Sequence, residues 1–212
     1  LSMVEAAAIP EAFATSYLNL CVEAGMKAGD TVLIQAGASG LGMAAIQLAK
    51  TLGAVVVTTV GSEAKAEFVR GLGADVVVNR RTGDLAAAME EHPVDIAMDC
   101  VGGPTLGRCI GKMAVGGRWI LIATLGGNAA ELPLDTLYKR GIRLIGSTLR
   151  GRSSRMKAEI LAGLEAALWP AFASGAVRPV IHRTVPIARA EEAHAVLLNN
   201  ENSGKVVLTL KP

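Results

Sequence analysis

A glycine-rich turn between two regular segments is the feature that most restricts the fold of this chain. The turn reads Ala36-Gly37-Ala38-Ser39-Gly40-Leu41-Gly42. It follows residues 31–36, an apolar run with the length and β-branched content of a buried strand, and it opens residues 40–52, which are rich in helix-forming side chains. A turn this tight brings main-chain N–H groups to a helix N-terminus, where they can bind a pyrophosphate.

The turn departs from the G-x-G-x-x-G pattern, because Ser39 stands where the second glycine would be. A small hydroxyl still permits close approach and can donate a hydrogen bond to a phosphate oxygen. We therefore expect the turn at residues 37–42 to bind a dinucleotide. The alternative is a glycine-rich turn that is needed only to pack a strand against a helix.

Strand and helix alternate after this turn with little interruption. Strands are predicted at residues 31–36, 54–60, 75–79, 94–101, 118–124 and 142–147. Helices are predicted between them at residues 40–52, 63–72, 84–91, 105–113 and 133–139. Six strands joined by crossover helices predict an α/β fold with a doubly wound six-stranded parallel sheet of the Rossmann type.

The segments that flank this alternation have a different character. The opening Ser2-Met3-Val4-Glu5 has the capping-box pattern, and Pro10 stands in the first turn of a second predicted helix that continues to Val22. After the sheet, a helix over residues 153–169 is expected to end by Pro170. An extended segment at 177–186, a helix at 190–198 and a strand at 205–210 complete a C-terminal α+β segment.

Composition excludes several other classes of protein. The chain has 212 residues, 51% of them apolar, and its 21 Lys and Arg nearly balance its 19 Asp and Glu. This balance is unlike a disordered chain or a basic nucleic-acid binder, and no apolar run approaches the roughly 18 residues of a membrane span. No basic and apolar leader opens the sequence, so we expect a cytoplasmic protein. Its three cysteines and three histidines lack metal-ligand spacing, so neither a metal site nor a disulfide framework is expected.

The end of the second predicted strand indicates which dinucleotide is bound. An NAD site usually places an acidic residue there, and that charge repels the 2′-phosphate of NADP. Here the strand ends in Gly61-Ser62, with Lys65 one helical turn on and Arg80-Arg81 after the third strand, whereas Glu63 falls in the first turn of a helix. We therefore predict NADPH, with Ser62, Lys65 and Arg80 around the extra phosphate. The alternative is an ordinary exposed charged surface.

Two further glycine loops follow later predicted strands. Cys100-Val101-Gly102-Gly103 follows the fourth strand and Ala123-Thr124-Leu125-Gly126-Gly127 follows the fifth. Ligands of open parallel sheets bind at the carboxyl ends of the strands, so we expect these loops to pass close to the nicotinamide ribose. Ordinary turn chemistry is the alternative for each loop taken alone.

The chain resembles one enzyme family over essentially its whole length. The segments that carry the resemblance include EAAAIPEAFATSYLNL from Glu5, AGMKAGDTVLIQAGASGLGMAAIQLAK, GSEAKAEFVRGLGAD, MDCVGGPTL, GGRWILIATLGG, GSTLRGR and EEAHAVLLNNENSGKVVLTL. They are similar to the quinone oxidoreductase branch of the medium-chain dehydrogenase/reductase superfamily, in particular its tumour-suppressor-inducible, zinc-independent type. The resemblance implies hydride transfer from NADPH to a quinone or a similar activated acceptor.

The resemblance also implies roles for individual residues. It places the pyrophosphate on the turn at residues 37–42, the 2′-phosphate on Ser62 and Lys65, and the nicotinamide ribose between the two later loops and Thr148-Leu149-Arg150. Many relatives have a Tyr where Arg80 stands, so an Arg contact is expected on the adenine side. Thr15 is expected near the nicotinamide, unless its hydroxyl bonds its own backbone. The expected cofactor-binding residues are Thr15, Gly37, Ala38, Ser39, Gly40, Leu41, Gly42, Gly61, Ser62, Lys65, Arg80, Val101, Gly102, Thr124, Leu125, Thr148, Leu149, Arg150 and Lys205.

Family members carry an N-terminal barrel-like catalytic domain before the point where this chain begins. By resemblance, residues 1–10 are a linker helix from that domain, residues 11–150 are the dinucleotide-binding domain, and residues 151–212 return to the catalytic domain. The opening helix and the tail should then expose apolar surface or pair with another copy. The resemblance also implies a homodimer through the strand at residues 142–147. No residue of the chain is assigned as a catalytic acid or nucleophile.

Other functions compete with quinone reduction. A short-chain dehydrogenase is disfavoured because it needs a Tyr and a Lys four positions apart, whereas Tyr138 and Lys139 are adjacent and Tyr17 has Cys21 at that spacing. An enoyl or 2-alkenal reductase of the same superfamily, including a polyketide synthase module, stays open. So does an NADPH-binding fragment without turnover.

Overall fold

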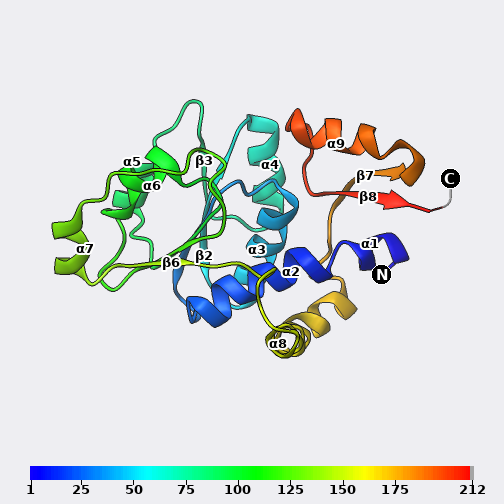
Figure 1. Ribbon diagram of the computed structural model, residues 1–212, viewed down its shortest axis with the longest axis horizontal. Coiled ribbons are helices and arrows are strands. Elements are labelled where there is room, and N and C mark those ends of the chain that lie inside the picture. Colours follow the sequence, from blue (N-terminus) through cyan, green and yellow to red (C-terminus); the bar gives the residue numbers. More distant parts are fainter. Residues whose placement is uncertain (211–212) are drawn as a thin grey trace.

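The computed structural model describes residues 1–210 and contains the predicted six-stranded sheet (Figure 1). The strand order is β3-β2-β1-β4-β5-β6, and every neighbouring pair is parallel. The strands are β1 (Thr31–Ile34), β2 (Val55–Val60), β3 (Val76–Asn79), β4 (Ile96–Asp99), β5 (Arg118–Leu121) and β6 (Arg143–Gly146). The prediction of a doubly wound α/β fold is therefore confirmed, with strand order reversing between β1 and β4.

Helices cover both faces of this sheet (Figure 1). Side chains alternate along each strand, so Val32 and Ile34 of β1 belong to one buried cluster and Leu33 to another. The helices between the strands are α3 (Gly40–Thr51), α4 (Glu63–Gly71), α5 (Leu85–Glu91), α6 (Gly103–Ile110) and α7 (Leu134–Arg140). The first cluster includes residues of α3 and α4, and the second includes residues of α5 and α6.

Two short helices and a wider turn precede the sheet. The predicted capping box at α1 (Met3–Ala7) is confirmed, because the Glu5 amide donates to Ser2 Oγ and the Ser2 amide donates to the Glu5 carboxylate. The second predicted helix divides into α2 (Pro10–Tyr17) and a π-helical turn, η1 (Leu18–Glu23). In that turn the Asn19 side chain donates to the Thr15 carbonyl at 2.7 Å and so competes with the regular ladder.

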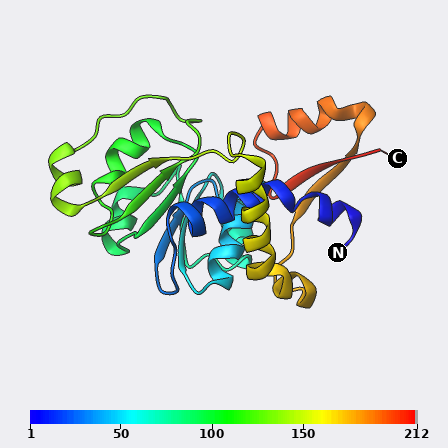
Figure 2. The ribbon, with the colours of Figure 1, turned by 60° about the horizontal axis from the view of Figure 1, so that its bottom comes forward.

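One boundary prediction at the C-terminal side of the sheet is wrong. Helix α8 (Ser154–Ser174) continues through Pro170, where the sequence predicts a stop. Proline removes one helical hydrogen bond, and packing offsets this cost: Phe172 is buried against Phe13 of α2, with ring centroids 5.1 Å apart. Figure 2 shows α8 lying beside α2.

The remaining segments form a small unit of their own. Strands β7 (Ile181–Pro186) and β8 (Lys205–Thr209) pair in parallel, and η2 (Ile187–Arg189) and α9 (Ala190–Leu198) connect them. This unit lies beside α1, at the right-hand end of the molecule in Figure 1.

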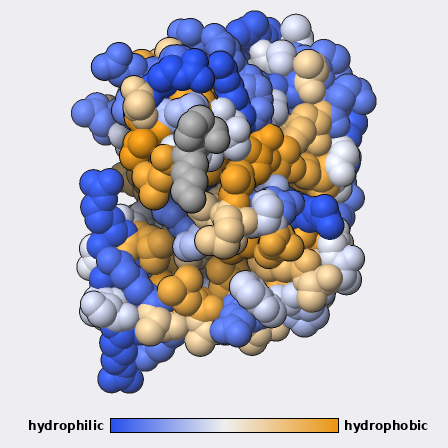
Figure 3. Space-filling view, turned by 90° about the vertical axis from the view of Figure 1, so that its right-hand side faces the viewer, coloured by the Kyte–Doolittle hydropathy of each residue, from blue (hydrophilic) through white to orange (hydrophobic). Residues whose placement is uncertain are grey.

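The face at that end is strongly apolar (Figure 3). Met3 of α1 is 86% exposed and Leu208 of β8 is 40% exposed, and Leu1, Ile187 and Leu210 are also exposed. The expected exposed apolar surface on the opening helix and the tail is therefore present. Within residues 1–210, no helix combines the length and apolarity that crossing a bilayer requires.

Candidate cofactor site

Two glycines of the glycine-rich turn serve close packing. A Cβ on Gly42 would collide with the main chain of Ala36 and Gly37, and a Cβ on Gly37 would collide with Thr58 Oγ1. The Gly37 amide donates to the Thr59 carbonyl at 2.9 Å, and the Ala36 amide donates to Thr59 Oγ1 at 3.0 Å. These contacts hold the start of α3 tightly against β1 and β2, as the packing interpretation expects.

The same turn also leaves main-chain donors at the N-terminus of α3. The first N–H groups of a helix have no partner within the helix. Ser39 Oγ accepts from the Gly42 amide at 2.9 Å and so caps the helix. The amides of Gly40 and Leu41 lie in the first turn of α3, at the positive end of the helix dipole. The Ser39 hydroxyl retains its own hydrogen for a ligand. The turn therefore suits a pyrophosphate.

A cleft of about 930 Å³ opens beside this turn. It lies at the carboxyl ends of the strands, because the parallel registers of β1 with β2 and β4 bring those ends together. Eight of the residues expected from the sequence line it: Ala38, Ser39, Gly61, Ser62, Lys65, Arg80, Val101 and Leu125. Its size and position fit an extended dinucleotide.

Three cations gather at the β2 and β3 end of the cleft. Lys65, Arg80 and Arg81 all line it, and burial, followed by repulsion from Arg80 and Arg81, lowers the pKa of Lys65. The Arg80 Nε lies 3.3 Å from where a Cβ of Gly61 would be, so the bare glycine makes room for the guanidinium. Ser62 Oγ caps α4 by accepting from the Lys65 amide at 3.3 Å. Such a cluster suits a phosphate group.

Glu63 does not belong to that cluster. Its carboxylate pairs with Arg70 Nη1 at 3.2 Å on the exposed side of α4, and Arg70 also pairs with Glu67 at 2.6 Å. Glu63 is absent from the residues that line the cleft. The placement of Glu63 past the strand end is therefore correct.

A buried carboxylate fixes the loop after β4. Asp99 accepts from the amides of Val101 and Gly102 at 2.6 and 3.0 Å, from Gln35 Nε2 at 2.8 Å and from Trp119 Nε1 at 2.9 Å. Burial raises the pKa of Asp99 even though these donors favour its ionised form. Asp99 thus holds the Val101–Gly102 segment at the cleft wall.

The loops after β4 and β5 lie side by side. The Gly126 amide donates to the Val101 carbonyl at 2.7 Å, and a Cβ on Gly102 would lie 3.3 Å from Thr124 Cγ2. Leu125 is 83% exposed at the cleft edge. Cys100 also lines this end, and burial raises its pKa to about 11. This end of the cleft is therefore built from main chain, apolar side chains and a neutral thiol.

A further cluster of polar groups lies across the start of α3. A Cβ on Gly40 would collide with the stem of Lys205, so this side chain covers the first residue of the helix. Lys205 Nζ is 4.0 Å from Glu11 Oε2, and the Thr15 hydroxyl donates to Glu11 Oε1 at 3.0 Å. The Thr15 hydroxyl thus bonds a side chain rather than its own backbone. A cation is unfavourable at a helix N-terminus unless an anion lies nearby, and Glu11 provides one here. Lys205 does not line the cleft, but its stem covers Gly40, so a pyrophosphate at the start of α3 would be a second anion beside it.

Some expected residues lie elsewhere, and other cleft residues escape sequence analysis. Leu149 packs against the core, and the Arg150 carbonyl accepts from Lys157 at 3.0 Å. The predicted residues that do not line the cleft are Thr15, Gly37, Gly40, Leu41, Gly42, Gly102, Thr124, Thr148, Leu149, Arg150 and Lys205. The lining also includes Gln35, Thr59, Thr105 and Arg108, the end of α9 with Leu197 and Leu198, and the loop after it with Asn199, Asn200 and Asn202. No local signal marks that loop, because it meets the cleft only through the tertiary fold.

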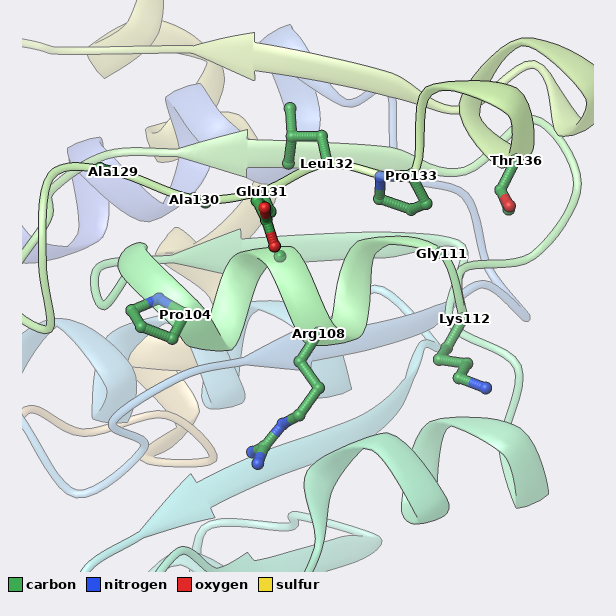
Figure 4. Close-up of a pocket in the computed structure, with 11 residues that line it drawn as sticks. Pro104, Arg108, Gly111, Lys112, Ala129, Ala130, Glu131, Leu132, Pro133 and Thr136 are labelled. Atoms are coloured by element: carbon green, nitrogen blue, oxygen red, sulfur yellow. The ribbon is translucent and has the colours of Figure 1, made fainter.

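A second hollow of about 860 Å³ lies between α6 and the extended segment at residues 129–133. Figure 4 shows Leu132 and Pro133 above α6, with Arg108 and Lys112 pointing away from that segment. Gly107 permits this close approach, because a Cβ there would collide with the Glu131 carbonyl. The hollow lacks the glycine turn, so the first cleft is the candidate cofactor site.

Comparisons with known proteins agree with this geometry. Residues 40–165 match the family model described as zinc-binding dehydrogenase. The chain is 36% identical over 219 residues to the spectinabilin polyketide synthase system protein NorB of Streptomyces orinoci, covering 100% of this chain and 10% of NorB. It is 29% identical over 219 residues to the quinone oxidoreductase of Sus scrofa, covering 99% of this chain and 64% of that enzyme.

A solved structure of a mycobacterial protein complexed with NADPH shares the fold. The TM-score is 0.85 at 28% identity, over 98% of this chain and 66% of that one. The chain thus spans less than two thirds of the curated relatives just named. Despite the family's description, residues 1–210 contain no group of three or more His, Cys, Asp or Glu that could hold a metal ion. The chain belongs to the zinc-binding dehydrogenase family of medium-chain oxidoreductases.

Proposed function

We propose that the protein is an NADPH-dependent quinone oxidoreductase. The choice of NADPH rests on the cationic end of the cleft, where Lys65, Arg80 and Arg81 converge. Glu63 lies outside this end and pairs with Arg70. A 2′-phosphate is favoured by such a cluster and repelled by an acidic residue. The NADPH complex of the mycobacterial neighbour supports the same choice.

The residues of the chain bind and orient the cofactor. The amides of Gly40 and Leu41, with Ser39 and Lys205, hold the pyrophosphate, and the cationic cluster holds the 2′-phosphate. The loops that carry Val101 and Leu125 border the nicotinamide end. NADPH supplies a hydride from C4 of its nicotinamide, so the chain contributes orientation and electrostatic support.

The apolar nicotinamide end supports a flat, conjugated acceptor. Val101 and Leu125 give it an apolar wall, and the thiol of Cys100 stays protonated with its pKa raised to about 11. Transfer of the hydride to a quinone gives a hydroquinone monoanion, whose negative charge lies on oxygen, and this oxygen takes the one proton that completes the hydroquinone from water. The reaction therefore requires no acid from the lining that the structure describes.

An enoyl reductase is the second candidate. The chain is more similar to NorB, a polyketide synthase system protein, than to the quinone oxidoreductase of Sus scrofa. This difference favours an enoyl reductase of the polyketide synthase kind. Reduction of an enone by hydride creates a carbanion equivalent at carbon, which must then be protonated. A binding protein that holds NADPH without turnover is a third possibility.

Turnover with two acceptors separates these candidates. We expect the chain, and any longer protein that contains it, to oxidise NADPH with 9,10-phenanthrenequinone faster than with a 2-alkenal. Good reduction of the alkenal without quinone turnover would favour the enoyl reductase and contradict the proposal. NADPH binding without turnover of either acceptor by the longest natural form would favour the binding protein.

We also propose a homodimer through the free edge of β6. Leu144 of this strand is 40% exposed, and Tyr138 of the adjacent α7 is 73% exposed. An edge strand with exposed apolar side chains is a template for strand addition. Sedimentation of wild type and of Ile145→Pro tests the pairing; a monomeric wild type would contradict it.

A further inference from the structure

The loop between α9 and β8 forms one wall of the cofactor cleft. Asn199, Asn200 and Asn202 of the loop line the cleft together with Leu197 and Leu198, the last residues of α9. Lys65 and Arg80 line the same cleft. The loop also meets the glycine turn, because the Gly204 amide donates to the Ala38 carbonyl at 2.9 Å and Ser39 pairs with Gly204 in an isolated bridge. The C-terminal unit is thus attached to both phosphate-binding regions of the cleft.

One contact in this wall fixes the side chain of Lys65. Its ammonium donates to the main-chain carbonyl of Asn200 at 2.6 Å. A lysine ammonium has three donors, so this bond leaves two for the oxygens of a phosphate. A long side chain that is already held in one rotamer loses less entropy when it binds a ligand.

The backbone of Asn200 is held in an uncommon conformation. Within residues 1–210, Ala36 and Asn200 are the two residues other than glycine with positive φ, both at 55°, and both line the cofactor cleft. A positive φ is disfavoured for residues with a Cβ, but it is the usual conformation of the residue after a helix C-cap, and Asn200 follows Asn199, the C-cap of α9. Asn tolerates this region better than most residues.

The hydrogen bonds of this helix end, including that from the Glu201 amide to the Val196 carbonyl at 3.0 Å, hold Asn200 in place. The Asn200 amide donates to the Leu197 carbonyl at 3.1 Å, and the Asn202 side chain donates to the Gly204 carbonyl at 3.0 Å. The direction of the Asn200 carbonyl is therefore set by the loop, and Lys65 follows it.

We propose that Asn200 is a positioning residue for NADPH specificity. Its left-handed backbone aims a carbonyl at Lys65, which presents the ammonium to the 2′-phosphate beside Arg80. The inference deepens the proposed function and rests on it. The contact acts on the 2′-phosphate alone, so it changes the affinity for NADPH and leaves the affinity for NADH unchanged.

Substitution of Asn200 tests this role in the 212-residue chain. A β-branched residue is strained at positive φ, so Asn200→Val should redirect the carbonyl. We expect the Kd of NADPH, measured by its fluorescence, to rise about three- to tenfold, the range expected when one long side chain must be ordered on binding. The Kd of NADH should stay within about twofold. Asn200→Gly keeps the backbone conformation and should bind both cofactors like wild type.

Two further variants separate positioning from a general effect on the fold. Ser203→Val places the same side chain in the same loop, at a residue that does not line the cleft and whose φ is not positive, and should leave both affinities unchanged. In a Lys65→Met background, Asn200→Val should no longer affect NADPH. Melting temperatures check that each variant folds, and Asn200→Thr repeats the test if N200V does not.

The outcomes distinguish this inference from the proposed function. A folded N200V that keeps the NADPH to NADH preference of wild type would overturn the positioning role while the proposed cofactor stands. An equal loss of both affinities would assign Asn200 a structural role only and also overturn it. A wild-type chain that binds both cofactors equally would overturn the proposed cofactor, and the positioning role with it.

Discussion

The two ends of the cofactor cleft are built in different ways. At the β2 and β3 end, charged side chains have fixed neighbours: Lys65 bonds Asn200 and Arg80 lies over Gly61. At the β4 and β5 end, the wall is main chain held by Asp99, with the exposed Leu125 at its edge. Under the proposed function, the side chains at the first end would recognise the cofactor, whereas the second end would contribute mainly the shape of the cleft wall.

The largest effect we expect is on the alkylation rate of Cys100, whose thiol lines the apolar end of the cleft. Burial raises the pKa of Cys100 to about 11. At pH 8 only about one thousandth of such a thiol is ionised, roughly a hundredfold less than for a free cysteine. Alkylation by iodoacetamide, followed by mass spectrometry, should therefore be about a hundredfold slower at Cys100 than in a denatured control.

The sign of the pH dependence follows from the direction of that shift. Because the pKa is raised, labelling of the folded protein should accelerate as pH approaches about 11. Rapid labelling of Cys100 at pH 8 in the folded protein would show that the apolar end is wetter than the structure indicates.

Loss of a cation at the opposite end should change the affinity for NADPH specifically. Arg80→Gln removes a charged donor that we propose for the 2′-phosphate. We expect the Kd of NADPH to rise about ten- to hundredfold, since hydrogen bonds to charged groups contribute about 1.5–3 kcal/mol. The Kd of NADH should change little. An equal rise for both cofactors would place Arg80 at a part of the dinucleotide that they share.

Lys205 provides the matched comparison, because it lies at the glycine turn between the two ends. Lys205→Met keeps most of the aliphatic stem that covers Gly40 but removes the charge. We expect NADPH and NADH affinities to fall together, by about three- to tenfold, because the pyrophosphate is common to both. A change in the ratio of the two affinities would contradict this assignment.

The smallest effect on cofactor affinity is expected at Glu63. From sequence spacing alone, this residue could be mistaken for the acid that selects NAD. Its carboxylate pairs with Arg70 outside the cleft. Glu63→Gln should therefore leave both Kd values within about twofold, because an exposed ion pair contributes little. A marked gain in NADPH affinity would show that the carboxylate repels the 2′-phosphate.

The sheet could be predicted from the sequence because the patterns that indicate its strands are local. Apolar runs of strand length, closed by glycines, predict all six strands, and the carboxyl ends of those strands locate the cleft. The capping box at Ser2 and the turn at residues 37–42 are equally local.

The missed features depend on contacts between distant segments. Helix α8 passes Pro170 because Phe172 is buried against Phe13, a gain that no local propensity includes. Lys65 and Asn200 lie 135 positions apart, so their hydrogen bond has no signature in either segment. Likewise, the packing role of Gly42 appears only when strand and helix are placed together.

The difference between the dissociation constants of NADPH and NADH tests the central claim most directly. Titration of the 212-residue chain with each cofactor, followed by fluorescence, measures both values under one set of conditions. The cationic cluster predicts that NADPH binds at least about tenfold more tightly, the effect of one or more charge-assisted hydrogen bonds to the extra phosphate. Equal affinities, or tighter binding of NADH, would contradict the account.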